Sequence, residues 1–375
     1  MSKQNLLFSK LKLRSLHLKN RIVVSPMCQY MAVEGHIQDW HIAHHSRFAL
    51  GGMALSFVEA TGITPEGRIT HGCTGIWHDN HVLGLEKIVK LYHAQNIAVG
   101  IQIGHAGRRA SCVRLSDGGQ PISKTDTDEP SWEIIGPSAI AEKKGYPVPR
   151  CMSHEEIIEV VEAFKAAAKR ALDAGFDTIE IHGAHGYLIH SFFSPLSNHR
   201  NDQYGGNLRR RMTFPLMITE AVREIWPENK PLFFRVSAVD NISGGISIED
   251  TVELAKELKL HGVDIIDCSS GGMSGPSTLS REKIKRGFQV PYSEKIKKES
   301  GVNTMAVGLI IEAEQAETIL KSNQADLIAL AREMISDSNW AYHAAHKLGH
   351  ENPYEILPPS YAFHLQSRSE NMNVD

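Results

Sequence analysis

The chain has 375 residues, of which 42% are hydrophobic and 22% are charged, and its formal net charge is -3 at pH 7. This length and composition are typical of a globular protein that buries a large core, and they exclude a disordered or fibrous protein. The small net charge provides no basic field for nucleic acid, so we expect a small-molecule partner and no nucleic-acid partner.

Short apolar, β-branched runs alternate with longer amphipathic segments along the chain, which predicts βα units around a parallel sheet. The eight predicted strands are 22–26, 54–59, 98–103, 178–182, 232–236, 264–268, 304–307 and 326–329. Eight units in a chain of this length favour an α/β fold of one (β/α)8 TIM barrel, because the barrel closes after eight strands. The sequence therefore predicts a single domain over residues 1–375.

Segments outside the minimal barrel also carry signals. Alternating leucines within residues 1–21 predict a hairpin across the bottom of the barrel. Residues 104–151 are too long for an ordinary βα loop, and their place after the third strand predicts a lid or substrate-facing insertion. The clearest helix is 153–174, because Ser153 and Glu156 match a capping box and Gly175 ends the pattern.

The absence of membrane, signal and cysteine motifs indicates the cellular compartment and the redox state of the cysteines. No segment approaches about 18 uninterrupted apolar residues, and the amino terminus has no apolar stretch followed by a small-residue cleavage site. We therefore expect a cytoplasmic protein with no membrane partner. The five scattered cysteines include no C-x-x-C, which argues against disulfides and against a zinc or iron–sulfur site, so we expect no metal.

Polar side chains follow several predicted strands, at the end of the barrel where TIM-barrel chemistry lies. The fourth strand ends in His182-Gly183-Ala184-His185-Gly186-Tyr187, and Arg235 emerges from an apolar strand. By residue type alone, the two histidines fit hydrogen-bond donors, a metal pair or packed core histidines. A buried Arg235 needs a partner, which a structural salt bridge or a ligand would provide.

Taken together, these motifs resemble the Old Yellow Enzyme family, and more closely its bacterial branch with a cysteine on the first strand, the YqjM-like and xenobiotic-reductase-like enzymes. The resemblance extends from Lys19 to about Lys347. The segments that carry it are Ser25-Pro26-Met27-Cys28, Ile181-His182-Gly183-Ala184-His185-Gly186-Tyr187-Leu188, Ser194-Pro195-Leu196-Ser197-Asn198-His199-Arg200 with Asp202, Tyr204-Gly205-Gly206, and Phe234-Arg235-Val236-Ser237. It implies FMN as cofactor and NADPH or NADH as reductant.

The resemblance implies an ene-reductase that passes hydride through FMN to the β-carbon of an α,β-unsaturated carbonyl or related nitro compound. His182 and His185 would donate hydrogen bonds to the substrate oxygen, and Tyr187 would deliver a proton to the α-carbon. Tyr30 would line the substrate pocket. Nicotinamide and alkene would use the same flavin face in turn, which explains why the chain has no G-x-G-x-x-G fingerprint.

Cofactor contacts are also implied by the resemblance. It places Arg235 beside the flavin N1 and C2 oxygen and Gln102 at the pyrimidine edge, and Ala60 would leave space for the ring. A further set would contact the flavin or its phosphate, and it consists of Ser25, Pro26, Met27, Cys28, Gly308, Ala331 and Arg332. Cys28 would tune the flavin potential, whereas relatives usually have glycine in place of Ala331. The run from Gly271 to Gly275 would contact flavin or form a tight turn.

Each of these residues also has a purely structural interpretation. Gln102, Ala60 and Tyr30 fit ordinary core positions, and Cys28 fits an inert small hydrophobic side chain. Arg332 fits a surface arginine at the start of a helix.

The carboxy-terminal tail, residues 350–375, departs from the resemblance. In the cysteine-bearing branch, an arginine after a tyrosine reaches into the neighbouring subunit's active site, but the first arginine of this tail is Arg368, seven residues after Tyr361. We predict a homodimer or dimer of dimers in which Tyr361 or Phe363 takes that place, with Tyr361 as a substrate contact. The alternative is a tail packed on its own barrel or left disordered.

These sequence patterns favour an ene-reductase but leave other activities open. A flavoprotein desaturase of cyclic ketones would need the same groups in the reverse direction. Two other classes stay open from the residues: a metal-dependent barrel lyase or hydrolase, and a non-catalytic flavin-binding sensor.

Overall fold

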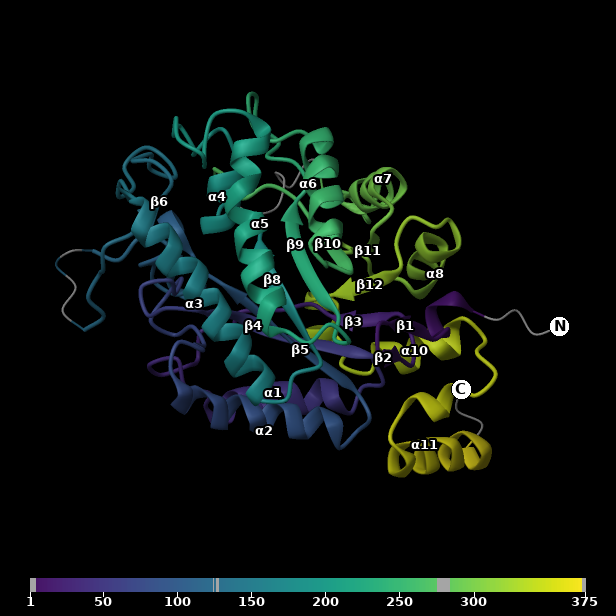
Figure 1. The fold of residues 1–375 in the computed structure, drawn as a ribbon. Coiled ribbons are helices and arrows are strands. Elements are labelled where there is room, and N and C mark those ends of the chain that lie inside the picture. The colour runs from purple at the N-terminus through teal and green to yellow at the C-terminus, as the bar shows by residue number, and fades with distance from the viewer. Residues whose placement is uncertain (1–4, 124, 126–127, 275–283, 373–375) are drawn as a thin grey trace.

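The computed structural model describes residues 5–123, 125, 128–274 and 284–372. Within them, eight parallel strands close into a barrel, and the last strand pairs with the first (Figure 1). In barrel order the strands are β3 (Ile22–Val24), β4 (Leu55–Gly62), β5 (Ala98–Gly104), β8 (Thr178–Gly183), β9 (Leu232–Ser237), β10 (Ile265–Ser269), β11 (Asn303–Ala306) and β12 (Leu327–Leu330). The predicted TIM barrel is confirmed, with small shifts at the strand ends.

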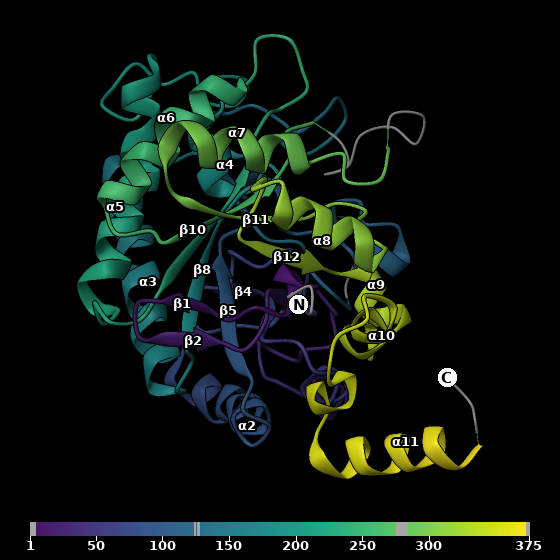
Figure 2. The same ribbon diagram turned by 90° about the vertical axis from the view of Figure 1, so that its right-hand side faces the viewer.

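Helices surround the strands (Figures 1 and 2). They are α1 (Asp39–Ala49), α2 (Val82–His93), α3 (His154–Asp173), α4 (Leu188–Phe193), α5 (Leu208–Ile225), α6 (Ile248–Leu260), α7 (Val290–Ser300), α8 (Ala313–Lys321), α9 (Arg332–Ser336) and α10 (Trp340–Lys347), and a further helix, α11 (Pro359–Met372), lies apart from them (Figure 2). Helix α3 begins as predicted, because the Ser153 hydroxyl accepts from the Glu156 backbone and the Glu156 carboxylate accepts from the Ser153 backbone.

The lower barrel interior is apolar and closed by a hairpin. Strands β1 (Leu11–Leu13) and β2 (Leu16–Leu18) pair antiparallel, as predicted. Their side chains Leu13 and Leu18 pack in one buried cluster with interior residues near the strand starts, which include Val23, Leu55 and Phe233. This end of the barrel is therefore a packed core, and the opposite end, where the strands finish, is left for chemistry.

The long segment between β5 and α3 folds against the carboxyl ends of the strands. It contains short 3-10 turns at Gly107–Arg109 and Leu115–Asp117 and the small strand pair β6 (Ile135–Gly136) and β7 (Arg150–Cys151). The Arg108 guanidinium is buried within it and donates to the backbone oxygens of Met273, Ile140 and Ala141. These hydrogen bonds join the segment to the loop after β10.

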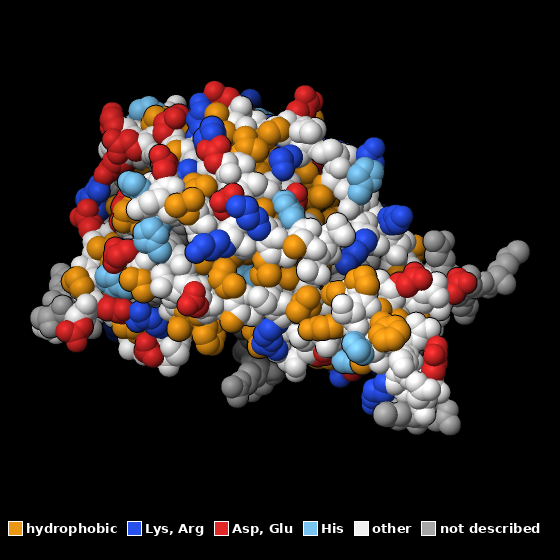
Figure 3. Space-filling model, turned by 90° about the horizontal axis from the view of Figure 1, so that it is seen from below, with side chains coloured by type: hydrophobic (Ala, Val, Ile, Leu, Met, Phe, Trp, Pro, Cys, Tyr) orange, Lys and Arg blue, Asp and Glu red, His pale blue; other side chains and the backbone are white. Residues whose placement is uncertain are grey.

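The carboxy-terminal segment leaves the barrel and forms α11, which projects from the body of the molecule (Figure 2). Over the face seen from below, acidic and basic side chains are interspersed, so this face has no field of one sign (Figure 3). Among the helices of the described residues, none is both long and apolar enough to cross a membrane.

Candidate active site

Three rings meet where β8 ends and α4 begins. The ring centroids of His182 and Tyr187 are 4.9 Å apart, and those of His182 and His185 are 5.1 Å apart, both edge to face. His182 is the penultimate residue of β8, and Tyr187 is the N-cap of α4. The sequence therefore places all three side chains on one strand-to-helix turn.

This turn has a backbone that few residues tolerate. His185 has a φ of +62°, in the left-handed region that costs a non-glycine residue free energy. Gly186 follows with a φ of +74°, and a Cβ there would lie 2.2 Å from the carbonyl oxygen of Gly272. The His185 backbone N–H donates to Ser237 Oγ at 2.9 Å, which holds the turn against β9. The strain is therefore offset by specific contacts around the two histidines.

Beneath the turn, the buried His190 accepts a hydrogen bond from the Gly186 backbone at 2.8 Å through Nδ1. Its Nε2 lies 2.9 Å from a carboxylate oxygen of Asp240, and both side chains are fully buried. Asp240 in turn accepts from the Ser194 hydroxyl. This chain of contacts connects the turn that carries His182 and His185 to the loop after β9.

Both histidines of the turn are held neutral. Burial lowers the pKa of His182 and of His185 well below its ordinary value, and the positive charge of Arg235 lowers both further. The Ala184 backbone N–H donates to His182 Nδ1 at 3.3 Å, so the proton of neutral His182 is on Nε2. That nitrogen lies 3.3 Å from His185 Nδ1.

The tautomer of His185 depends on Ser269. His185 Nε2 lies 2.7 Å from Ser269 Oγ, and the Ser269 hydroxyl donates its own proton to Gln289 Oε1 at 3.4 Å, so His185 Nε2 donates to Ser269. The proton of neutral His185 is then on Nε2, and its Nδ1 accepts the hydrogen bond from His182 Nε2. The two facing ring nitrogens are therefore hydrogen-bonded to each other.

Tyr187 lies beside a cation of the insertion, Arg109. Burial raises the pKa of Tyr187, so the phenol is protonated at neutral pH. The guanidinium carbon of Arg109 lies 5.7 Å from the centroid of the Tyr187 ring. Arg109 also donates to the backbone oxygens of His185 and Gly272, each at 2.6 Å. The insertion therefore contributes a positive charge to the site.

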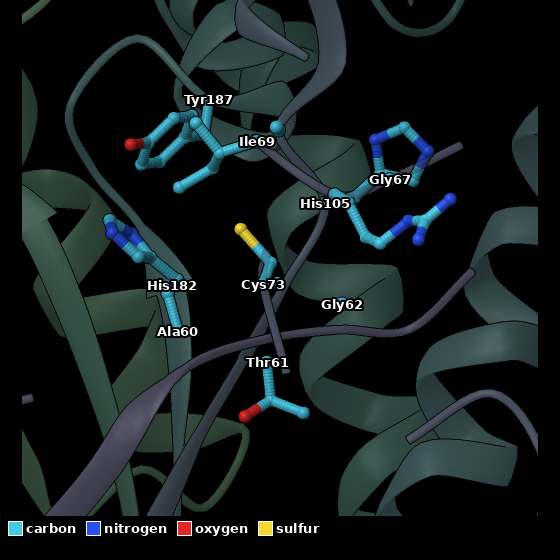
Figure 4. A pocket seen from close by; sticks show the side chains of 12 residues that line it. Ala60, Thr61, Gly62, Gly67, Ile69, Cys73, His105, His182 and Tyr187 are labelled. Carbon is cyan, nitrogen blue, oxygen red and sulfur yellow. The ribbon is translucent and has the colours of Figure 1, made fainter. Parts of the chain in front are cut away.

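Three hollows converge on these rings. One, drawn in Figure 4, lies between β4 and β5 and is lined by Ala60, Cys73 and His105 together with His182 and Tyr187. A wider one of about 1070 Å³ opens under the insertion and is lined by Tyr30, Arg109, Tyr146, His185 and Tyr187.

The third hollow is a cleft of about 700 Å³ after β11 and β12. It is lined by Arg235, Gly308, Ala331, Arg332 and His185. Gly308 has a φ of +112°, and a Cβ there would lie 2.7 Å from Gln289 Nε2. Ala331 is the N-cap of α9 and Arg332 is its first residue, so Arg332 is an exposed arginine at a helix start, as one interpretation predicted, and it also lines the cleft.

The first strand ends in a partly exposed segment. Ser25 is buried, whereas Pro26, Met27, Cys28 and Tyr30 are each partly exposed. Burial raises the pKa of the Cys28 thiol well above its usual range, and the nearby charge of Glu59 raises it further. Cys28 is therefore a protonated, partly exposed thiol.

Comparison with known proteins decides the family. The model of the NADH:flavin oxidoreductase / NADH oxidase family matches residues 6–351. The chain is 44% identical to an NADPH dehydrogenase of Geobacillus thermodenitrificans over 92% of this chain and 94% of the relative. It is 42% identical to an NADPH dehydrogenase of Bacillus subtilis over 93% of this chain and 97% of the relative. The chain belongs to the NADH:flavin oxidoreductase / NADH oxidase family.

Solved structures agree with this membership. A morphinone reductase variant in complex with tetrahydroNAD is 25% identical, with a TM-score of 0.73 over 92% of this chain and 90% of that chain. The flavin oxidoreductase described above is thus an FMN-dependent enzyme that uses NAD(P)H, of the Old Yellow Enzyme type.

The structure brings most of the residues singled out in the sequence of this flavin oxidoreductase to the three hollows. The predicted residues that line none of them are Ser25, Pro26, Met27, Cys28 and Gln102, although the Arg235 guanidinium donates to Ser25 Oγ at 3.5 Å. Tyr361 is on α11 with 45% of its surface exposed, and it also lines none of the three hollows of its own chain. Gly271 and Gly272 form the turn against His185, whereas Gly275 lies outside the described residues.

Sequence reasoning missed several residues that contact the site. Arg109 and Ser269 contact His185, and the buried carboxyl groups of Glu180 and Asp267 lie below it. A signal was present for Glu180, since it precedes His182 by two positions and so points to the same face of the strand. The insertion has no such periodicity, so Arg109 had no comparable signal.

Proposed function

We propose that the enzyme reduces the activated carbon–carbon double bond of α,β-unsaturated carbonyl or related nitro compounds with NAD(P)H. The observation that carries this proposal is the pair of imidazole nitrogens, His182 Nε2 and His185 Nδ1, 3.3 Å apart beside Tyr187. When a substrate oxygen enters between them, transfer of the His185 proton to Nδ1, with the Ser269 hydroxyl turned to donate to Nε2, makes both facing nitrogens donors. Two donors at one oxygen stabilise the negative charge that develops there when a hydride arrives at the β-carbon.

The barrel mouth has the groups that FMN needs, which supports the proposed cofactor contacts. Arg235 is 8% exposed and lines the same cleft as Gly308 and Arg332. Gln102 is buried on β5, and its amide nitrogen has a partner on the side facing the barrel interior. We assign Arg235 and Gln102 to the pyrimidine edge of the flavin, which would receive a cation and an amide there.

At the other end, Gly308, Ala331 and Arg332 suit the phosphate of FMN. Gly308 has no side chain, so a ligand can approach its backbone closely. Arg332 adds a guanidinium to the same cleft. Ser25, Pro26, Met27, Cys28 and Ala60 would line the edge of the ring between these two ends.

When bound, FMN supplies a two-electron carrier between NAD(P)H and the alkene. The chain's own residues do the rest. His182 and His185 hold the substrate oxygen and polarise the double bond, and Tyr187, protonated at neutral pH, gives its phenolic proton to the α-carbon. Tyr30 and the insertion cover the wider hollow, where they limit the size of the substrate.

The direct test is anaerobic reduction of the FMN-loaded protein with NADPH, followed by addition of 2-cyclohexenone. We expect the flavin to bleach with NADPH and the colour to return with the enone faster than with oxygen, with cyclohexanone as product. Recovery only with oxygen would oppose ene reduction and favour a sensor.

Cys28→Ala should shift the flavin reduction potential and change the rates of the two half-reactions unequally, because it removes a thiol assigned to the flavin edge. Stability should change little, since the side chain is partly exposed. Spectroelectrochemistry and stopped-flow kinetics measure the first effect, and thermal unfolding the second. Cys151→Ala, at an exposed cysteine, is the control. An unchanged potential with a large loss of stability would show that Cys28 is an ordinary core residue.

The tail is proposed to cross a two-fold dimer interface. Helix α11 exposes Tyr361 by 45% and Phe363 by 69%, and exposed aromatic side chains on a projecting helix are typical of contacts with a partner. Truncation after Pro358 removes α11 but keeps Ile356 and Leu357, which pack on the barrel.

We expect this truncation to raise the KM for the enone or to yield a monomer, because Tyr361 or Phe363 would be lost from the neighbour's pocket. Sizing and steady-state kinetics measure both. Phe363→Ser in the full chain is the matched variant, since it leaves the helix in place. A dimer with an unaltered KM after truncation would contradict the shared pocket.

A further inference from the structure

A polar cluster lies in the barrel interior next to the rings. It consists of Gln102 on β5, Glu180 on β8, Arg235 on β9 and Asp267 on β10, four neighbouring strands of the barrel. The strand register pairs Gln102 with Glu180, and it pairs Arg235 with His182 on one side and with Asp267 on the other. Glu180 and Asp267 are 0% exposed, so water does not solvate either carboxyl group.

The polar side chains of this cluster contact one another in a row, but the cluster has one hydrogen-bond donor too few for its carboxyl oxygens. The Gln102 amide donates to Glu180 Oε1 at 2.7 Å, and Arg235 Nε lies 3.1 Å from Asp267 Oδ2. Glu180 Oε2 and both oxygens of Asp267 have no hydrogen-bond donor among the described residues, apart from the Arg235 ion pair. Two ionised carboxylates against a single arginine would leave one buried charge uncompensated, at a cost of several kcal/mol.

A single proton completes the chain. Placed on Glu180 Oε2 and donated to Asp267, it gives Asp267 a donor while Glu180 Oε1 still accepts from Gln102. Burial raises the pKa of Glu180 well above its usual value, and the nearby charge of Asp267 raises it further. Burial also raises the pKa of Asp267, but Arg235 opposes that change and keeps Asp267 as the ionised partner. Arg235 is the charged side chain that faces both carboxyl groups.

We propose that Glu180 and Asp267 are a positioning pair that holds one proton between them and directs Gln102 and Arg235 toward the flavin. With Glu180 protonated, Arg235 and Asp267 form a neutral ion pair, so the cation at the flavin is balanced from below. Glu180 then acts as a hydrogen-bond donor and not as a charge. The inference rests on the proposed placement of Gln102 and Arg235 at the pyrimidine edge of FMN.

Two substitutions distinguish the role of Glu180 as a hydrogen-bond donor from the role of Asp267 as the charged partner of Arg235. Glu180→Gln keeps the shape of the side chain and retains one donor and one acceptor, so it imitates the protonated carboxyl group. Asp267→Asn removes the negative charge beside Arg235. The measurements on the FMN-loaded protein are the midpoint potential of the flavin and the infrared C=O stretching band of a buried protonated carboxyl group, which differs from that of a carboxylate.

We expect the wild-type protein to show the protonated-carboxyl band, and Glu180→Gln to lose the band while keeping the wild-type potential. Asp267→Asn should raise the potential, because Arg235 then stabilises the added negative charge of a reduced flavin without compensation. Glu317→Gln is the matched control: Glu317 is a buried carboxylate that accepts from the backbone of Leu6 and Leu7 far from the flavin. It should change neither measurement.

A rise in potential in Glu180→Gln equal to that in Asp267→Asn would overturn the proposal, because it would mean that both carboxyl groups are ionised. Absence of the infrared band from the wild-type protein would overturn it as well, as would an unchanged potential in Asp267→Asn. If Asp267→Asn does not fold, the infrared band of the wild-type protein and the flavin potential of Glu180→Gln still test the proposal. The band does not depend on enone chemistry, so failure of the proposed function is detected separately, when 2-cyclohexenone does not restore the flavin colour.

Discussion

His182→Ala and His185→Ala should each slow enone reduction by about ten- to a thousand-fold while FMN stays bound and is still reduced by NADPH. Each substitution removes one of two donors to the substrate oxygen, and one such donor contributes about 3 kcal/mol to transition-state stabilisation. Because His182 and His185 are neutral, the loss reflects a hydrogen bond and not a charge. Stopped-flow measurement of the two half-reactions separates the effect on the enone from the effect on NADPH.

His17→Ala is the control for the histidine variants, since His17 is an exposed residue of the hairpin at the opposite end of the barrel. It should leave both half-reactions unchanged. Loss of FMN from His182→Ala or His185→Ala would count against the assignment, because it would place the histidine at the cofactor. An unchanged enone rate in both variants would contradict the paired-donor site.

Tyr187→Phe should slow the oxidative half-reaction by about a hundred-fold or more and retain substrate binding. The phenylalanine keeps the ring that packs against His182 but lacks the proton that the α-carbon needs, and general acids contribute about 10²–10⁴-fold to such steps. Reduction of the flavin by NADPH needs no such proton and should stay within about two-fold of the wild-type rate. Rapid-mixing kinetics with several enones measure both values.

Tyr292→Phe, on α7, provides the same chemical change away from the rings. If Tyr187→Phe reduced every enone at the wild-type rate, water or another residue would be the proton donor. A fall in the NADPH rate equal to the fall in the enone rate would instead show that Tyr187 positions the flavin or the nicotinamide.

The sequence predicts the barrel well because its signals are local and repeated. The capping box of Ser153 and Glu156 defines the start of α3 without any long-range contact. The eight apolar runs each match a strand, and the leucines before Ile22 form the hairpin that fills the barrel bottom. Where periodicity and caps decide the structure, the sequence is sufficient.

The site is only partly accessible from sequence, because its groups come from strands far apart in the chain. Arg235 could be read as a partner of a flavin or as part of a salt bridge, and the structure shows an ion pair with Asp267. That pairing requires knowledge of which strands are neighbours. The helical conformation of the tail was also not predicted: Pro359 begins α11, as proline often does at the first turn of a helix.

The central claim is that His182 and His185 jointly bind a negatively charged oxygen above the flavin. A phenolate has such an oxygen and cannot be reduced, so titration of the oxidised, FMN-loaded protein with 4-hydroxybenzaldehyde measures that binding alone, through the change in the flavin spectrum. We predict that His182→Ala and His185→Ala each raise the Kd by about ten-fold or more, since a charge-assisted hydrogen bond is worth about 1.5–3 kcal/mol. A Kd equal to that of the wild-type protein in both variants would contradict the account.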